Sequence, residues 1–250
     1  MVALDCKSFD SALETSAAIL SMPSSQLRGT LQEYYGSLSE SERDKALCID
    51  SLVDYCFCVS PDLLPSPRLT HWFHATRVVP GTEFGEGILP LSAMLEQTWS
   101  FLGDLASDWS TRGEWIGFRG TMKGEGANQY HHRLTSADEG PYAFLVRETI
   151  FLSDRLGNWD YLRTPETIHD ICRSYRKMFP DRDLHRRFLD ATRPCIVKFR
   201  STSEPDDLLF ALSYLFTVLA GDEIGRESLH CYCGRGRLVE PAEVLSIEWL

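Results

Sequence analysis

The chain has 250 residues, of which 43% are hydrophobic and 24% are charged, and its formal net charge at pH 7 is −11. This composition excludes a disordered or fibrous protein and can supply a full hydrophobic core for one large domain or two small ones. The excess of acidic residues repels polyanions on average, so a nucleic-acid site would need a local basic patch.

The sequence predicts no membrane-spanning segment and no disulfide framework. The most apolar stretch, residues 208–220, is shorter than the ~20 residues that cross a bilayer. The first ten residues contain no apolar signal core, so we expect a cytoplasmic location. Eight cysteines are sparse for a chain of this length, and in that compartment their thiols stay reduced.

Residues 1–64 predict a helical N-terminal subdomain. Apolar residues recur every three or four positions over 9–20 and again over 27–35, which is the spacing of one helix face. A Ser-x-x-Glu capping box at residues 39–42 predicts a further helix. Three prolines then interrupt the chain, so we expect a boundary between residues 1–64 and residues 65–250.

The remainder mixes strand and helix patterns, which predicts an α+β domain. Residues 107–140 carry several glycines and look irregular. Thr164 and Pro165 open a helix, with Thr164 as the N-cap residue. The expected strands and the other expected helices are, in chain order, strand 71–79, helix 92–105, strand 142–146, strand 195–199, helix 204–220, strand 228–233 and strand 244–250.

Basic residues gather between Arg173 and Arg200, where nine Lys and Arg occur with only three acidic residues. One interpretation is a solvated helix face, and the other is a surface that contacts phosphates. The loop at 158–163, Asn-Trp-Asp-Tyr-Leu-Arg, also has two interpretations. Its aromatic residues either line a site or pack over the start of the next helix.

Cysteine and histidine pairs raise the question of a metal site. The two Cys-x-Cys pairs, at residues 56–58 and 231–233, would direct their sulfurs to opposite faces of a strand. His71-x-x-His74, His131-His132 and His230 are further candidate ligands. Structural zinc sites usually space their ligands two to four residues apart, which the Cys-x-Cys pairs do not fit. We therefore expect no metal, and a zinc hydrolase remains a minor alternative.

A resemblance to a known family begins at His74-Ala75-Thr76, on a predicted strand. A glycine-containing turn and the segment Gly87-Ile88-Leu89 follow and lead into a helix. This order resembles the ADP-ribosyltransferase superfamily, in the His–Tyr–Glu branch of diphtheria toxin and the poly(ADP-ribose) polymerases. RNA 2′-phosphotransferases open in the same way. The resemblance covers residues 71–250 and implies a split β-sheet core.

The resemblance also implies how NAD would be bound. His74 would contact the adenosine-side ribose, the backbone of Ala75 would bind the nicotinamide amide, and Thr76 would support them with its hydroxyl. Tyr142, which follows a glycine on a middle strand, would stack on the nicotinamide ring. Beside the family pattern, Arg77 is the first candidate for contact with the pyrophosphate.

The third family position is a glutamate at the head of a late strand, which stabilises positive charge on the ribose. Glu227, just before the strand expected at 228–233, is the predicted catalytic acid. Glu223 and Glu240 remain rivals for that role.

The function that follows from the resemblance is NAD-dependent mono-ADP-ribosyl transfer to a macromolecular acceptor, with release of nicotinamide. The acceptor, protein or nucleic acid, stays open. A compact transferase of this kind suits a toxin, an effector or a defence factor. The alternative is a non-catalytic interaction or inhibitor protein that binds a partner through its acidic helical residues 1–64.

Overall fold

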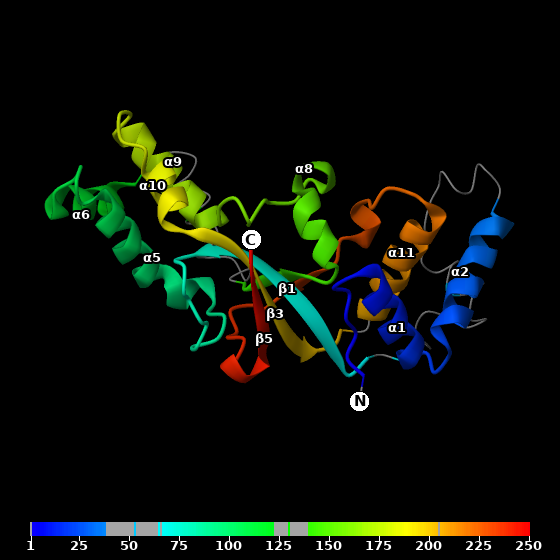
Figure 1. Ribbon diagram of the computed structural model, residues 1–250. Helices are drawn as coiled ribbons and strands as arrows, with labels where there is room; N and C mark the ends of the chain where they lie inside the picture. Colours follow the sequence, from blue (N-terminus) through cyan, green and yellow to red (C-terminus); the bar gives the residue numbers. More distant parts are fainter. Residues whose placement is uncertain are drawn as a thin grey trace. The chain divides into compact units, whose positions relative to one another are not determined.

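The computed structural model describes residues 2–38, 53, 65, 67–122, 130, 140–204 and 206–250 (Figure 1). This part of the chain is mixed α and β, as the sequence predicts, and contains a five-stranded sheet in the order β4-β2-β1-β3-β5. It divides into two compact units. Unit 1 comprises Met1–Phe73, Ala143–Asn158 and Phe199–Tyr232, and unit 2 comprises His74–Tyr142, Trp159–Lys198 and Cys233–Leu250.

The strands lie where alternating or β-branched residues predict them. They are β1 (Leu69–Val78), β2 (Tyr142–Phe144), β3 (Arg193–Thr202), β4 (Cys231–Cys233) and β5 (Val244–Trp249). β1 and β2 are antiparallel, with Phe73 opposite Phe144. The strand expected from residue 228 begins later, because Arg226–Ser228 forms the 3-10 helix η3.

The helices that the structure describes in unit 1 are α1 (Phe9–Ile19), α2 (Ser24–Ser37), the short α8 (Ser153–Leu156) after the 3-10 helix η2 (Arg147–Leu152), and α11 (Asp207–Ala220). α1, α2 and α11 contact one another and lie side by side in Figure 1. α11 buries residues on most of its faces, as its continuous apolar sequence predicts.

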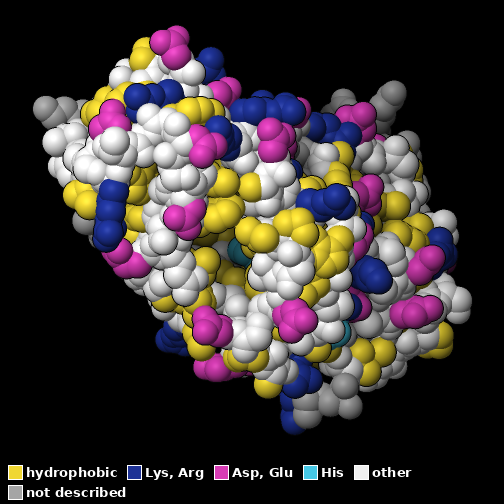
Figure 2. All heavy atoms as spheres, turned by 60° about the vertical axis from the view of Figure 1, so that its left-hand side comes forward, with side chains coloured by type: hydrophobic (Ala, Val, Ile, Leu, Met, Phe, Trp, Pro, Cys, Tyr) yellow, Lys and Arg dark blue, Asp and Glu magenta, His cyan; other side chains and the backbone are white. Residues whose placement is uncertain are grey.

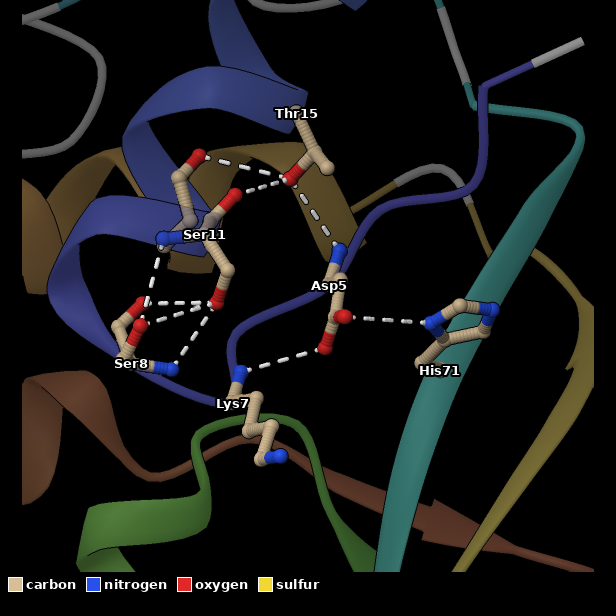
Figure 3. Close-up of polar contacts among 7 residues, drawn as sticks. Asp5, Lys7, Ser8, Ser11, Thr15 and His71 are labelled. Carbon is tan, nitrogen blue, oxygen red and sulfur yellow. Dashed lines mark hydrogen bonds and ion pairs between the residues drawn. The ribbon is translucent and has the colours of Figure 1, made fainter. Parts of the chain in front are cut away.

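The chain ahead of α1 is fixed to both α1 and β1 by side-chain contacts (Figure 3). The backbone N–H of Asp5 donates to Thr15 Oγ1 at 3.2 Å, and the Asp5 carboxylate lies 3.4 Å from His71 Nδ1 on β1. Ser8 and Ser11 form a reciprocal capping box that satisfies N–H groups at the start of α1.

In the described part of unit 2 the helices are α5 (Leu91–Ala106), α6 (Arg112–Thr121), α9 (Glu166–Met178) and α10 (Leu184–Ala191). α5 contacts α6 and α10, and α9 contacts α10. Their apolar faces enclose an aromatic core in which the rings of Trp99, Phe118 and Tyr175 are buried. A 3-10 helix, η4 (Pro241–Glu243), precedes β5.

Two local expectations are wrong. Residues 112–121 are not irregular but form α6, whose start is fixed by a capping box between Thr111 and Glu114. Thr164 is not the N-cap of α9, because the helix begins one residue later and Pro165 holds that position without a capping side chain.

Some expectations lie outside the described residues. They are the helix from residue 39, the boundary at residue 64, the pair Cys56-Phe57-Cys58 and the pair His131-His132. Among the helices that the structure describes, none combines the length and apolar character needed to span a membrane.

Candidate functional site

Unit 2 contains a cavity of about 790 Å³, within the ~300–1,000 Å³ typical of small-molecule sites. Its wall is formed mainly by β1, by residues 140–142, by the first three turns of α5 and by the start of α9. Figure 2 views the molecule from the side that carries these helices and shows a hollow bordered largely by hydrophobic side chains, with a histidine visible inside it.

Five residues that the sequence singles out for NAD binding line this one cavity. Four are consecutive on β1, namely His74, Ala75, Thr76 and Arg77, and the fifth is Tyr142 at the start of β2. They come together because β1 and β2 are antiparallel neighbours in the sheet. His74 and Tyr142 lie 68 residues apart in the sequence, and a direct hydrogen bond connects them.

That bond fixes the chemical state of His74. Its Nδ1 lies 2.6 Å from the carbonyl oxygen of Tyr142, and since a carbonyl only accepts, Nδ1 carries the proton and donates it. Burial lowers the pKa of His74 below its usual 6.5 more than this bond raises it. The ring is therefore neutral at pH 7, and Nε2 is an acceptor suited to a ligand hydroxyl or N–H.

Arg77 lines the cavity, but most of its hydrogen-bonding capacity is used within unit 2. Its guanidinium donates to the carbonyl oxygens of Leu162 (3.0 Å), Leu189 (3.2 Å) and Thr192 (2.9 Å) and, through Nε, to Thr192 Oγ1 (3.3 Å). Burial lowers its pKa, which nearby Asp160 partly offsets. Four of its five N–H groups are thus engaged, and one remains for a ligand.

We expect Arg77→Lys to lower the free energy of unfolding by about 2 kcal/mol, because an ammonium cannot span these four acceptors and leaves carbonyl oxygens unsatisfied. Urea denaturation measures this loss. The matched control is Arg163→Lys, at an exposed position in the same unit. An equal, small change in the free energy of unfolding of both variants would show that the hydrogen bonds of Arg77 do not stabilise unit 2.

The start of α5 is held in place by a close backbone approach. Gly87 has a φ of +81°, and a Cβ there would lie 2.0 Å from the carbonyl oxygen of Val239. Ile88 and Val239 exchange backbone hydrogen bonds of 3.0 and 3.1 Å. This explains the glycine of the Gly87-Ile88-Leu89 segment, which leads the chain to the cavity wall.

Both α5 and α9 begin at the cavity after a proline and without a capping side chain. In α5 the first intrahelical bonds are donated by Ala93 and Met94, both to Pro90, so the N–H groups of Leu91 and Ser92 have no acceptor within the helix. The first turn of α5 has no acidic residue, whereas that of α9 contains Glu166. The partial positive charge at the start of α5 therefore favours an anion.

None of the three predicted acids is among the cavity-lining residues. Glu227 belongs to η3 in unit 1, where its Oε1 accepts the N–H of Gly225 at 2.9 Å. Glu223, in the same unit, pairs with Arg155 at 3.3 Å, and Glu240 is the exposed N-cap residue of η4. Of the described residues that line the cavity, only Glu166 supplies a carboxylate.

The loop at 158–163 is divided between its two interpretations. Tyr161 lines the cavity. Trp159 instead packs over the start of α9, because its Nε1 donates to the Thr164 carbonyl oxygen at 2.6 Å and its ring lies 5.1 Å from that of His169. Glu166 follows the end of this loop by three residues, so the loop was the signal in the sequence that could have located it.

The basic stretch from Arg173 to Arg200 is mostly engaged with neighbouring residues. Arg187 pairs with Asp108 at 2.7 Å and its guanidinium lies 3.9 Å from the centre of the Trp109 ring. Arg182 donates to Ser110 Oγ at 2.8 Å. Arg186 and Arg176 also have acidic partners within unit 2. These contacts favour the interpretation as a solvated, ion-paired helix face.

Over the described ranges, no group of three or more His, Cys, Asp or Glu side chains is arranged to hold a metal ion. Comparison of the chain with models of protein families gave no match, and neither did comparison with curated proteins or with solved structures.

Proposed function

We propose that the unit 2 cavity binds NAD and that the protein is a mono-ADP-ribosyltransferase, which transfers ADP-ribose to a macromolecular acceptor and releases nicotinamide. The observation that carries this proposal is the convergence on one cavity of His74, Ala75, Thr76 and Tyr142, to which the resemblance assigns NAD contacts, and of Arg77, the candidate for the pyrophosphate. The cavity volume of about 790 Å³ is also in the range of ~300–1,000 Å³ that small-molecule ligands occupy.

The proposed binding mode follows from the polarity of the cavity wall. The ring of Tyr142 offers an aromatic face to the nicotinamide. His74, neutral and donating through Nδ1, presents Nε2 as an acceptor for a ribose hydroxyl. The pyrophosphate meets the N–H group of Leu91, which lines the cavity at the start of α5 and has no acceptor within the helix, together with the one N–H of Arg77 that remains.

The reaction requires few groups from the protein. The bond between ribose C1′ and the nicotinamide nitrogen breaks, and its electron pair leaves with neutral nicotinamide. A nucleophilic atom of the acceptor forms the new bond to C1′, and its proton passes to solvent. Positive charge develops on the ribose during this exchange, and a carboxylate held nearby stabilises it.

The experiment that tests the proposal uses the purified full chain with NAD labelled in the adenylate part, alone and with a cell lysate. Nicotinamide release and label on a protein or nucleic-acid band are expected, and the band identifies the class of acceptor. NAD binding without either signal would contradict transferase activity. Neither binding nor release would favour the non-catalytic alternative, in which the helical part of the chain binds a partner.

With Glu227 as the catalytic acid, we expect Glu227→Gln to lower the rate of nicotinamide release at least ~100-fold. The fold should persist, because a glutamine oxygen can still accept the Gly225 N–H that Glu227 Oε1 accepts at 2.9 Å. Release rates and circular dichroism of both proteins measure the two effects. Glu14→Gln, at an exposed position of the same unit, is the matched control. A full rate in Glu227→Gln would remove Glu227 from the mechanism.

A further inference from the structure

The cavity wall at Gly140 and Pro141 is contacted by a tight turn at residues 234–237. The N–H of Gly234 donates to the carbonyl oxygen of Pro141, and the N–H of Gly236 donates to that of Gly140, both at 2.9 Å. All of these residues belong to unit 2. Backbone hydrogen bonds from the turn therefore fix this side of the cavity.

The turn itself is held at both ends. The φ angles of its two central residues are +49° and +75°, and positive values at both positions are typical of a type I′ turn. The N–H of Arg237 closes the turn on the carbonyl oxygen of Gly234 at 2.9 Å. Two residues later, Val239 exchanges backbone hydrogen bonds of 3.0 and 3.1 Å with Ile88. Because of these bonds, the turn cannot easily move away from the cavity wall.

Gly234 lies too close to the wall to carry a side chain. A Cβ at this position would lie 2.6 Å from Pro141 Cδ and 2.9 Å from both the Pro141 nitrogen and the Gly140 carbonyl oxygen. The φ of Gly234 is not positive, so the close approach, and not the backbone conformation, requires glycine here. Two of the three contacted atoms are backbone atoms and the third belongs to a stiff ring, so a Cβ would displace the backbone of the wall.

Such a displacement would reach His74. Tyr142 follows Pro141 directly, and its carbonyl oxygen accepts the Nδ1 proton of His74 at 2.6 Å. The bond that one ring nitrogen makes decides which of the two nitrogens of a neutral histidine carries the proton. Hydrogen bonds weaken as their length and angle depart from the preferred values, so a shift of the Tyr142 carbonyl would let the proton move to Nε2. Nε2 would then no longer be an acceptor for a ligand.

We propose that Gly234 is a positioning residue of the cavity. Its close contact with the wall places the Tyr142 carbonyl oxygen so that His74 keeps its proton on Nδ1 and offers Nε2 to the ligand. Gly234 does not line the cavity and acts only through the residues that do. The positioning rests on the contacts of the turn, whereas NAD as the ligand rests on the proposed function.

The test measures which nitrogen of His74 carries the proton. Nuclear magnetic resonance of the ¹⁵N-labelled full chain gives the ratio of the Nδ1–H form to the Nε2–H form at neutral pH, and the His74 signals are those missing from His74→Ala. We expect the Nδ1–H form to predominate in the wild-type protein. In Gly234→Ala we expect the ratio to fall about fivefold, the effect of losing one neutral hydrogen bond. A wild-type protein in the Nε2–H form, or an unchanged ratio in Gly234→Ala, would overturn the proposal.

The matched control is Gly117→Ala, at an exposed position of α6 in the same unit, where a Cβ would meet no atom within 4 Å. It should keep the wild-type ratio, and a fall of the same size in this control would overturn the assignment to Gly234. Circular dichroism checks that each variant is folded. Should Gly234→Ala not fold, Gly236→Ala takes its place, because alanine at a φ of +75° strains the same turn. A fall in the ratio is then expected in that variant, and an unchanged ratio would overturn the proposal.

Calorimetry with NAD separates the positioning from the proposed function. We expect the dissociation constant to be about fivefold higher in Gly234→Ala than in the wild-type protein, because only the Nδ1–H form leaves Nε2 as an acceptor. A ratio that depends on Gly234, in a protein that does not bind NAD, supports the positioning and contradicts the transferase. NAD cleavage by a protein whose ratio does not depend on Gly234 does the reverse. Unchanged NAD affinity in a variant whose ratio has fallen would overturn the role of Gly234 toward the ligand.

Discussion

Asp207→Ala is expected to lower the free energy of unfolding by about 3 kcal/mol, the largest loss of stability that we expect from a single substitution in the described chain. Asp207 is the first residue of α11 and its relative exposure is 0%. A buried carboxylate of this kind is tolerated only because its oxygens are fully engaged.

The engagement comes from three separate parts of unit 1. Asp207 Oδ2 accepts the hydroxyl of Thr70 on β1 at 2.5 Å and the backbone N–H of Glu204 at 3.1 Å. Asp207 Oδ1 lies 3.0 Å from Nε2 of His230, whose ring stacks on Phe210 at 4.2 Å. Alanine would remove the acceptor of the half-buried His230 ring and of the Glu204 N–H and leave the buried Thr70 hydroxyl only Ser203 Oγ, 2.6 Å away, as a partner. The loss of three contacts at once exceeds that of one ordinary hydrogen bond.

Urea denaturation followed by circular dichroism measures the loss. The matched control is Asp206→Ala, which removes the neighbouring carboxylate at an exposed position where it makes no capping hydrogen bond. We expect this control to change stability by less than ~0.5 kcal/mol. Similar values for the two variants would show that the Asp207 contacts contribute nothing beyond helix-end electrostatics.

The elements that sequence patterns predicted well are those whose burial follows a simple periodicity. β1 is rich in aromatic and β-branched residues, and α11 is apolar over three turns, so the type and approximate range of each could be predicted. The prediction was less accurate at the ends, because a residue such as Pro165 can be the last of a loop or the first of a helix with little change in energy.

α6 was missed because its sequence contains three glycines, which disfavour a helix, and few apolar residues. Two features outweigh that preference. The capping box between Thr111 and Glu114 satisfies N–H groups at the start, and Phe118 is buried against the rings of Trp99 and Tyr175. The first was visible in the sequence, whereas the second depends on tertiary packing.

The candidate site shows the same division. A consecutive run such as His74 to Arg77 must share one strand, so its members could be located together from the sequence alone. The hydrogen bonds of Arg77 could not be predicted from the sequence, because its acceptors at Leu162, Leu189 and Thr192 are brought near only by folding. Glu166 lies 92 positions after His74, and no periodicity connects a helix start to a strand at that distance.

His74→Ala is expected to raise the dissociation constant for NAD by at least tenfold, since it removes the Nε2 acceptor from the cavity. It also removes the Nδ1–H that satisfies the Tyr142 carbonyl oxygen at 2.6 Å, so Tyr142 itself could move. His74→Gln separates these effects, because its amide keeps a donor and an acceptor. We expect an intermediate affinity for this variant, and calorimetry with NAD measures all three proteins.

The pH dependence of stability gives a readout that does not involve NAD. Burial lowers the pKa of His74 from 6.5 in the folded protein. As the pH falls below 6.5, the His74 imidazole is therefore protonated in the unfolded chain before it is protonated in the folded one. The wild-type protein therefore loses stability as the pH falls from 7.5 to 5.5, by up to about 1.4 kcal/mol per pH unit from this group. His74→Ala should lose less over the same range. Parallel pH profiles of the two proteins would mean that His74 is already solvated, and the cavity would then lack the neutral acceptor on which the proposed binding mode depends.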